Sequence, residues 1–148
     1  DGKQPGKRRK MVIGIGTDIL EISRIESTRR TGTENRIFTE HERRQASGRD
    51  SMLAGDFACK EAVAKCFGTG FRGFRPIDVE VLRDELGKPY VVLHGGARTL
   101  YEQLGGRSIQ VSISDTKELV IAFAILEGTD GNRQDDLSQE DSGTPERQ

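Results

Sequence analysis

The segment 52–67 is apolar around almost its whole circumference, and this pattern limits the possible folds more than any other part of the chain. At about 100° per residue, its hydrophobic side chains point in nearly every direction around a helix. These side chains are Leu53, Ala54, Phe57, Ala58, Ala62, Val63, Cys66 and Phe67. We therefore expect a central helix that other elements cover on most sides and that ends at Gly68.

Two charged residues of this helix, Glu61 and Lys65, lie one turn apart on one flank, beside Ala54 and Ala58. An exposed pair at this spacing contributes only about 0.3 to 0.5 kcal/mol, whereas buried charges each cost several kcal/mol unless they are paired or coordinated. A ligand or a metal ion is one explanation for these charges. An ordinary salt bridge at the edge of a core helix is the other.

A second acidic residue ends the short apolar run 11–18, which reads as a strand that stops at Asp18. Gly14 and Gly16 in this run would let another backbone or a ligand come close. Gly-x-Gly without a third glycine argues against a dinucleotide-binding fingerprint. Asp18 is therefore either part of a site or the N-cap of a helix that follows it.

The remaining hydrophobic pattern predicts a mixed fold. Three isoleucines recur at helical spacing over residues 19–25, and Thr39-x-x-Glu42 is a capping box at the start of a short polar helix. After the central helix the hydrophobic period changes to two. Strands are predicted at 77–82, 89–93, 109–114 and 119–126, and a short helix at 97–104. We expect an α+β domain in which an antiparallel sheet packs against the long central helix.

The two ends of the chain differ from its middle. Residues 1–10 are basic and residues 128–148 are acidic, and neither segment has enough apolar side chains to fold alone, so we expect both to be disordered extensions of one domain at 11–127. Without them, basic and acidic residues nearly balance, which gives no case for binding to nucleic acid or to a membrane surface. No apolar run is long enough to span a membrane, and no signal-peptide pattern opens the sequence, so the predicted location is cytoplasmic.

The cysteines and histidines form no metal-ligand pattern. Cys59 and Cys66 lie seven residues apart on the predicted helix, about 10 Å along its axis, which is too far for a disulfide. We expect both to be buried thiols in a reducing compartment, and we expect no zinc site. His41 and His94 have no partner pattern and are predicted to be surface residues.

Two of these segments together resemble the signatures of a known family. The run Ile15-Gly16-Thr17-Asp18 and, about 40 residues later, Phe57-Ala-x-Lys-Glu-Ala-x-x-Lys65 resemble the two motifs of the 4'-phosphopantetheinyl transferase superfamily, in its small single-domain type, the holo-acyl-carrier-protein synthases. The resemblance runs in order from residue 11 to about residue 127. Supporting segments are 17–25, 67–70, 86–90 and 111–116.

This resemblance implies an enzyme and assigns its centre. Asp18 and Glu61 would hold Mg²⁺, with Mn²⁺ as an alternative, and Lys65 would contact the phosphates of coenzyme A. A serine of an apo acyl carrier protein would attack the diphosphate, giving holo carrier protein and adenosine 3',5'-bisphosphate. Glu61 would act as general base, either directly or through a metal-bound water, and the sequence leaves these two routes open.

Other positions carry weaker implications. Asp115 stands where many relatives have His, so it is either a coenzyme contact or a turn residue. Gly68 could let backbone approach the nucleotide, although a helix would stop there in any case. Asp56 stands where relatives commonly have Arg (Ala-Gly-Arg-Phe against Ala-Gly-Asp-Phe here), which puts in doubt one positive contact for the coenzyme phosphates.

The resemblance also implies partners. Acyl carrier proteins are acidic, and Arg24 matches a basic position on the first helix through which relatives dock them. Arg29, Arg30 and Arg36 lie nearby and are either docking residues or solvated surface. A homotrimer with sites at the subunit interfaces is expected. The alternatives of another class are a non-catalytic module that binds coenzyme A or a nucleotide, and a domain that only binds a carrier protein. The presence of both Asp18 and Glu61 favours the enzyme.

Overall fold

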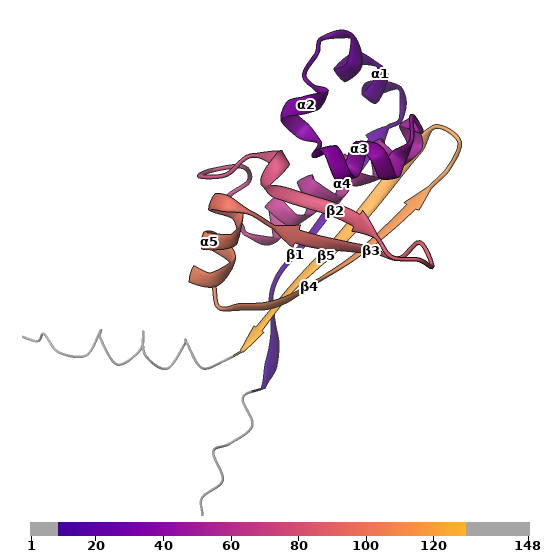
Figure 1. The fold of residues 1–148 in the computed structure, drawn as a ribbon. Coiled ribbons are helices and arrows are strands. Elements are labelled where there is room, and N and C mark those ends of the chain that lie inside the picture. The colour runs from indigo at the N-terminus through magenta and orange to yellow at the C-terminus, as the bar shows by residue number, and fades with distance from the viewer. Residues whose placement is uncertain (1–8, 130–148) are drawn as a thin grey trace, which may run out of the picture.

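The computed structural model describes residues 9–129, which form a three-stranded antiparallel sheet, a separate hairpin and five helices around a single core (Figure 1). The main sheet has the order β1-β5-β4. Its strands are β1 (Lys10–Glu21), β5 (Leu119–Thr129) and β4 (Gly106–Asp115). The hairpin consists of β2 (Val79–Arg83) and β3 (Pro89–Leu93).

Helix α4 (Asp50–Cys66) packs on the main sheet and is also in contact with β2. The other helices are α1 (Ser23–Arg30), α2 (Glu34–Ile37), α3 (Glu40–Ala46) and α5 (Gly95–Gln103), with a 3-10 turn at Pro76–Asp78. Helices α1 and α3 pack on α4, so the helix is covered on several sides, as its apolar circumference predicts. The predicted α+β class is confirmed.

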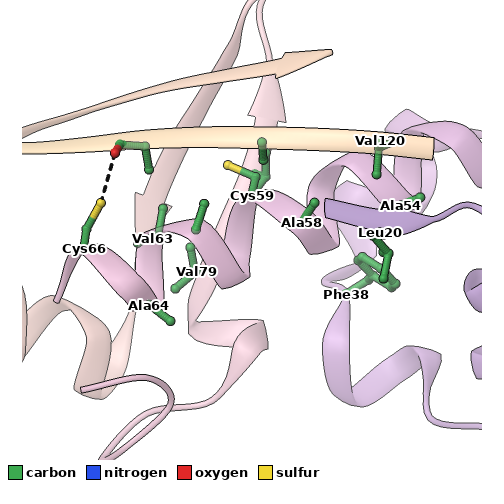
Figure 2. Packing of buried hydrophobic residues seen from close by; sticks show 14 of the residues in the cluster. Leu20, Phe38, Ala54, Ala58, Cys59, Val63, Ala64, Cys66, Val79 and Val120 are labelled. Carbon is green, nitrogen blue, oxygen red and sulfur yellow. Dashed lines mark hydrogen bonds between the residues drawn. The ribbon is translucent and has the colours of Figure 1, made fainter. Parts of the chain in front are cut away.

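The core is built from small side chains on α4 and aliphatic side chains on the sheet (Figure 2). Ala58, Ala62 and Val63 are fully buried, and Phe67 is nearly so. Both cysteines are free and buried, as predicted. The Cys66 thiol donates to the carbonyl of Ala124 at 3.3 Å, and burial raises the pKa of the Cys59 thiol to about 12, so neither group is an exposed thiolate.

Two glycines of β1 let α4 lie directly on the strand. A Cβ at Gly14 would stand 2.0 Å from the carbonyl oxygen of Cys66, and one at Gly16 would stand 1.9 Å from that of Ala62. Both distances are far inside van der Waals contact, so no residue with a side chain fits without moving the helix. The expected close approach is therefore made by backbone, and it fixes which residues of α4 face the end of β1.

The region after Asp18 differs from the prediction. The strand does not stop there but continues to Glu21, and the helix begins only at Ser23. Ile19 and Leu20 pair with Ile121 and Val120 of β5, and this ladder outweighs the helical spacing of the isoleucines. Asp18 is thus a strand residue, and its alternative role as a helix N-cap is wrong.

Other boundaries are close to expectation. The Thr39 and Glu42 capping box forms, with the Thr39 N–H donating to Glu42 Oε1 at 2.9 Å. The first hairpin strand begins at Val79 because the preceding residues form the 3-10 turn, and the hairpin makes its own sheet rather than joining the main one. The main sheet includes Lys10 and Thr129, slightly beyond the predicted domain of 11–127. The rest of the predicted extensions, residues 1–8 and 130–148, lies outside the described residues. Between residues 9 and 129, no helix has the length and hydropathy of a membrane span.

Candidate active site

Asp18, Glu61 and Lys65 come together where β1 crosses α4. Asp18 lies on the same side of β1 as Gly16, since successive side chains of a strand alternate. A Cβ atom added at Gly16 would stand 3.1 Å from Cβ of Lys65, which places the last turns of α4 against this part of the strand. The close contact that glycine permits therefore brings residues 43 and 47 positions apart in the chain to one place.

Lys65 bridges the strand and the helix. Its Nζ donates to the carbonyl oxygen of Thr17 at 2.8 Å and lies 3.5 Å from Oδ1 of Asp18. The Lys65 side chain is about half exposed, whereas that of Asp18 is mostly buried. The ammonium group is consequently positioned by β1 but remains open to a ligand from solvent.

Glu61 is a half-buried carboxyl with charges of both signs around it. Burial raises its pKa, the Asp18 carboxylate raises it further, and Lys65 and Arg24 act in the opposite direction, with a raised pKa as the result. Asp18, Glu61, Lys65 and Arg24 therefore form one electrostatic group drawn from β1, α4 and α1. Two carboxylates that repel each other in this way favour either a proton or a cation between them.

The donor set fits a hard divalent cation. Mg²⁺ prefers oxygen ligands, is usually held by one or two carboxylates and keeps its other positions for water and phosphate oxygens. Asp18 and Glu61 supply two such carboxylates. Within residues 9–129, no three His, Cys, Asp or Glu side chains are grouped as metal ligands.

Arg24 lies on the exposed side of α1 at the edge of this group. It lines a cavity of about 160 Å³ together with Leu20, Ile25 and Phe57. Arg29, five residues further along α1, instead forms an ion pair with Asp50 at the start of α4. Arg30 and Arg36 are exposed.

Gly68 and Asp115 lie at the ends of α4 and β4 respectively. Gly68 follows α4 with φ of +77°, a left-handed conformation that suits glycine at a helix end, so the predicted helix stop is confirmed. Asp115 is the last residue of β4, and the side-chain acceptor for the turn that follows is the Thr116 hydroxyl, which accepts from the N–H of Leu119 at 3.2 Å. Asp115 lines a second cavity, of about 280 Å³, at the N-terminal end of α4 with Arg49 and Arg83.

Asp56 has a basic partner that the sequence did not indicate. It is buried in α4, and Nη1 of Arg83 in β2 donates to its Oδ1 at 2.7 Å. Burial raises the pKa of Asp56 to about 7, although Arg83 acts to lower it. The acidic residue in place of the common family Arg is thus one half of an ion pair between the helix and the hairpin.

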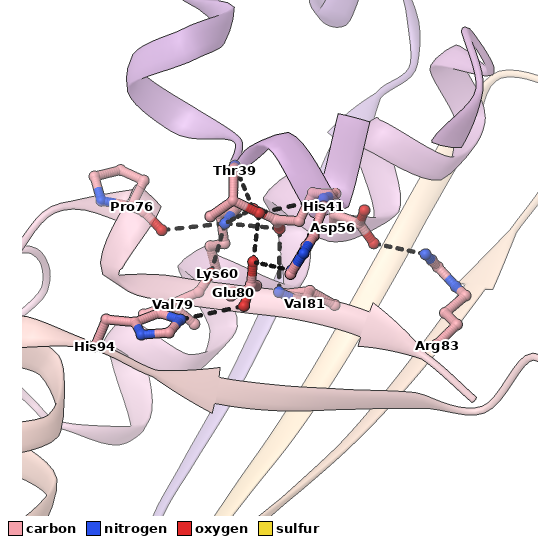
Figure 3. A network of polar contacts seen from close by, with 11 residues as sticks. Thr39, His41, Asp56, Lys60, Pro76, Val79, Glu80, Val81, Arg83 and His94 are labelled. Carbon is pink, nitrogen blue, oxygen red and sulfur yellow. Dashed lines mark hydrogen bonds and ion pairs between the residues drawn. The ribbon is translucent and has the colours of Figure 1, made fainter. Parts of the chain in front are cut away.

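Lys60, the residue before Glu61, forms a buried ion pair with Glu42 that the sequence pattern does not predict (Figure 3). Both side chains are completely buried, and Nζ of Lys60 lies 2.9 Å and 2.8 Å from the two oxygens of Glu42. The same ammonium donates to the carbonyls of Val79 at 2.5 Å and Pro76 at 3.2 Å. Lys60 precedes Glu61, so these bonds fix the rotation of α4 at the residue beside the candidate base. A lysine within an apolar helix was the available signal.

The two histidines are exposed, as predicted, but they share a partner. Nε2 of His94 lies 3.2 Å from one oxygen of Glu80, and Nδ1 of His41 lies 3.8 Å from the other (Figure 3). Hydrogen bonds from Thr39 and His94 are among the effects that lower the pKa of Glu80, despite its burial. The predicted surface position is confirmed, and the shared partner Glu80 is a contact that the sequence pattern does not indicate.

Comparison with known proteins identifies the family of this chain. A sequence profile of the 4'-phosphopantetheinyl transferase superfamily matches residues 14–124. Holo-[acyl-carrier-protein] synthase of Lachnoclostridium phytofermentans is 48% identical over 118 residues, which cover 79% of this chain and 97% of that protein.

Two solved structures share the fold. Holo-(acyl-carrier-protein) synthase from Bacillus anthracis in complex with CoA (3',5'-ADP) aligns with a TM-score of 0.66 at 36% identity, covering 80% of this chain and 99% of that one. The Helicobacter pylori holo-[acyl-carrier-protein] synthase in complex with coenzyme A aligns with a TM-score of 0.68 at 26% identity, covering 76% and 98%. With its two motifs joined at one site and this similarity along most of its length, the chain belongs to the 4'-phosphopantetheinyl transferase superfamily, among the holo-acyl-carrier-protein synthases.

Proposed function

We propose that this chain transfers the 4'-phosphopantetheine group of coenzyme A to a serine of an apo acyl carrier protein, with Asp18, Glu61 and Lys65 at the reaction centre. The observation that supports these roles is the meeting of two carboxylates and an ammonium group at the glycine-mediated contact of β1 with α4. Transfer from a diphosphate needs positive charge on the phosphoryl oxygens and a group that takes the proton of the attacking hydroxyl.

The bonds that change are defined by the products. The serine hydroxyl oxygen forms a bond to the phosphorus that carries pantetheine, and the bond from that phosphorus to the bridging oxygen breaks. The bridging oxygen leaves with its electron pair on adenosine 3',5'-bisphosphate. The serine proton passes to a base in the site.

Glu61 is our candidate for that base. A carboxyl whose pKa is raised holds a proton more readily than an ordinary carboxylate, and proximity to Asp18 contributes to this raised pKa. Lys65, fixed by the Thr17 carbonyl and half exposed, would pair with the phosphates of coenzyme A. Asp18 and Glu61 would hold Mg²⁺, which when bound supplies charge neutralisation at the phosphoryl oxygens.

We further propose that the carrier protein docks at Arg24 and that the enzyme is a homotrimer. The outer face of the main sheet, opposite α4, supports self-association because it exposes a continuous set of apolar side chains. These are Ile15, Ile19, Leu119, Ile121 and Phe123, which are between 38% and 62% exposed. Ile19 and Ile121 pair directly across β1 and β5, and we call this set the outer sheet face.

The test is to mix the protein with coenzyme A, Mg²⁺ and an apo carrier protein and to weigh the carrier by mass spectrometry. We expect a gain equal to one phosphopantetheine group. We also expect the gain to vanish in excess chelator and to return with Mg²⁺ or Mn²⁺, since both accept oxygen-rich sites. Unchanged carrier in the presence of all components would refute the transfer, and full transfer in chelator would refute the metal.

A further inference from the structure

Helix α4 has apolar side chains around almost its whole circumference, and several of them are small. Four of its alanines are buried: Ala54, Ala58, Ala62 and Ala64. A helix with a single apolar stripe is oriented by burying that stripe, whereas a helix that is apolar on most sides gains little from one rotation over a neighbouring one. The rotation of α4 nevertheless decides where Glu61 and Lys65 point. A contact that fits only one rotation is therefore needed.

Lys60 makes such a contact on the side of α4 that faces the hairpin (Figure 3). A lysine ammonium has three N–H donors, and here it has three acceptor groups. The Glu42 carboxylate lies at 2.9 Å and 2.8 Å through its two oxygens, the Val79 carbonyl at 2.5 Å and the Pro76 carbonyl at 3.2 Å. These groups belong to α3, β2 and the 3-10 turn. A rotation of α4 would break the set.

The acceptors of Lys60 are themselves fixed. Glu42 Oε1 accepts from the N–H of Thr39 at 2.9 Å, and Glu42 Oε2 accepts from the N–H of Val81 at 3.1 Å. The Val79 carbonyl is part of the backbone of β2, which is paired with β3. The ammonium group is thus bound to points that backbone hydrogen bonds already hold, and not to a mobile side chain.

The stability of the fold does not by itself explain this ion pair. Burial lowers the pKa of Lys60, although Glu42 acts to raise it, so the charged form is costly at this position. Replacing a buried ion pair by apolar groups of similar volume often leaves a protein equally stable or more stable. What a buried polar contact can add is the selection of one arrangement among several that pack equally well.

Asp56 makes a second contact of the same kind. It lies one turn before Lys60, about 40° away around the helix, and accepts from Nη1 of Arg83 at 2.7 Å. Asp56 and Lys60 are the fully buried charged residues of α4. Val79 begins β2 and Arg83 ends it, so the strand holds the helix at two points. Two points along one strand define both the rotation of α4 and its position along its axis.

The reaction centre lies on another side of the same helix. Glu61 and Lys65 are about 100° and 140° around α4 from Lys60. On the sheet side, Gly14 and Gly16 of β1 meet backbone carbonyls of α4, so the helix is held between β1 and β2. A turn of about 20° would move a group about 5 Å from the helix axis by about 2 Å. Such a turn would separate Glu61 from Asp18.

We propose that Lys60 is a positioning residue, whose bonds to Glu42 and Val79 set the rotation of α4 that brings Glu61 and Lys65 to Asp18. Lys60 is completely buried and touches no substrate, so it acts only through the helix. Its effect on transfer rests on the proposed function, whereas its effect on the rotation does not. A displacement of about 1 Å between reacting groups can lower a rate by about 100-fold.

The test removes both charges together in Glu42→Gln/Lys60→Met. We expect kcat to fall at least about 10-fold, while the KM for the carrier protein stays nearly unchanged because Arg24 belongs to α1. The matched control is Glu102→Gln/Arg98→Met, the corresponding change in an exposed ion pair of α5, which should behave as wild type. Circular dichroism in the assay buffer gives the folded fraction. Equal kcat in both double variants, or a loss of kcat that only follows the folded fraction, would overturn the proposal.

Two further measurements keep the test independent of folding yield and of transfer. Glu42→Asp keeps both charges but shortens the acceptor by one methylene, and should lower kcat by a smaller factor. In a crystal structure of the double variant, Nζ of Lys65 should lie beyond hydrogen-bond distance of the Thr17 carbonyl, which it reaches at 2.8 Å in the unaltered chain. An unmoved Lys65 would overturn the proposal. If wild type transfers nothing but Lys65 moves, the proposed function fails and the positioning role stands.

Discussion

At the scale of single residues, burial and a neighbouring carboxylate both act on Glu61. Burial raises the pKa of Glu61 most, Asp18 raises it further, and Lys65 and Arg24 only partly compensate. The ionised form of Glu61 is thus less favourable in the fold than it would be in water. Residues kept in such an arrangement are candidates for function, because stability alone does not select for them.

The first prediction follows from this repulsion. Asp18→Asn and Glu61→Gln should each lower the transfer rate by at least about 100-fold, because a group that transfers a proton in the transition state contributes about this much or more. The free energy of unfolding should stay equal or rise, since each change removes a repelling charge. Rates by mass spectrometry and urea unfolding curves measure both. A variant that unfolds, with activity in proportion to its folded fraction, would show that the residue is structural.

The second prediction concerns docking at Arg24. An exposed arginine that faces an acidic partner acts mainly on association, and this attraction is screened over about 8 Å at physiological salt. Arg24→Ala should raise the KM for the carrier protein, flatten the dependence of kcat/KM on ionic strength and leave coenzyme A binding nearly unchanged. Arg24→Glu should be worse than Ala because it adds repulsion.

The measurement is a salt series of initial rates at saturating coenzyme A, above the pKa of Glu61, because Arg24 also affects that pKa. Arg107→Ala serves as the control, since Arg107 lies near the start of β4, at the opposite end of the main sheet from α1. Equal salt slopes for wild type and the Arg24 variants would place the docking surface elsewhere.

Single residues also show what a sequence can predict. Asp18, Glu61 and Lys65 could be proposed because their spacing matches a family pattern and their charges interrupt apolar runs. Lys60 interrupts the same run, yet its role was not predicted, because its partner Glu42 lies 18 positions away. The capping box with Thr39 already accounted for a glutamate at position 42. Asp56 and Arg83 were missed as a pair for the same reason, since a contact between distant positions leaves no periodic pattern.

At the scale of elements, the contact of β1 with α4 decides the geometry of the site. Gly16→Ala would place a methyl group against the Ala62 carbonyl and push the helix away from the strand beside Asp18. We expect turnover to fall at least about 10-fold. The unfolding free energy should fall by about 1 to 3 kcal/mol. Gln103→Ala, at the exposed last residue of α5, is the control. Wild-type kcat in Gly16→Ala would show that the close contact does not position the site.

The ion pair of Lys60 and Glu42 ties α4 to α3 and β2. Lys60→Met should reduce the unfolding free energy by about 3 to 5 kcal/mol, because it leaves the buried charge of Glu42 without a partner. Glu42→Gln/Lys60→Met removes that charge and should cost less than the sum of the single changes. Denaturant unfolding of all three variants forms a double-mutant cycle. Additive losses would mean that the two side chains do not stabilise each other.

Element boundaries were predicted well where local chemistry determines them. The capping box at Thr39 and the glycine stop at Gly68 are both confirmed. The end of β1 was not, because the helical spacing of its isoleucines competes with pairing to β5, and only the long β5 makes the extended form win. The hairpin was predicted, but not its separation from the main sheet, since pairing between non-adjacent strands is a tertiary property.

At the scale of the whole molecule, the outer sheet face is the feature that one chain leaves uncovered. Ile121→Asp should place a charge at its centre and convert the proposed trimer into monomers, as measured by size-exclusion chromatography with light scattering. Transfer should be lost with the trimer. Leu86→Asp is the matched control, because Leu86 is 96% exposed but belongs to the turn of the separate hairpin. Identical molar masses for all three proteins would exclude this face as the interface.

The apolar character of β5 on both sides was visible in the sequence, and the structure divides it into a core side and the outer sheet face. A sequence pattern of this kind indicates that both sides are covered without saying by what. The class of fold and the family are confirmed, whereas the arrangement of copies depends on surfaces that only a folded chain defines.

The position of Asp18 inside a strand has a consequence for motion. Its backbone is paired with Ala122 of β5, the central strand of the main sheet, and Glu61 belongs to the regular helix α4. Neither carboxylate is therefore part of a loop. Neither side of the pair then needs to fold or close when a ligand arrives, and little chain entropy is lost at that step. Amide hydrogen exchange along β1 and α4 should accordingly be slow in the free protein and change little when a ligand binds.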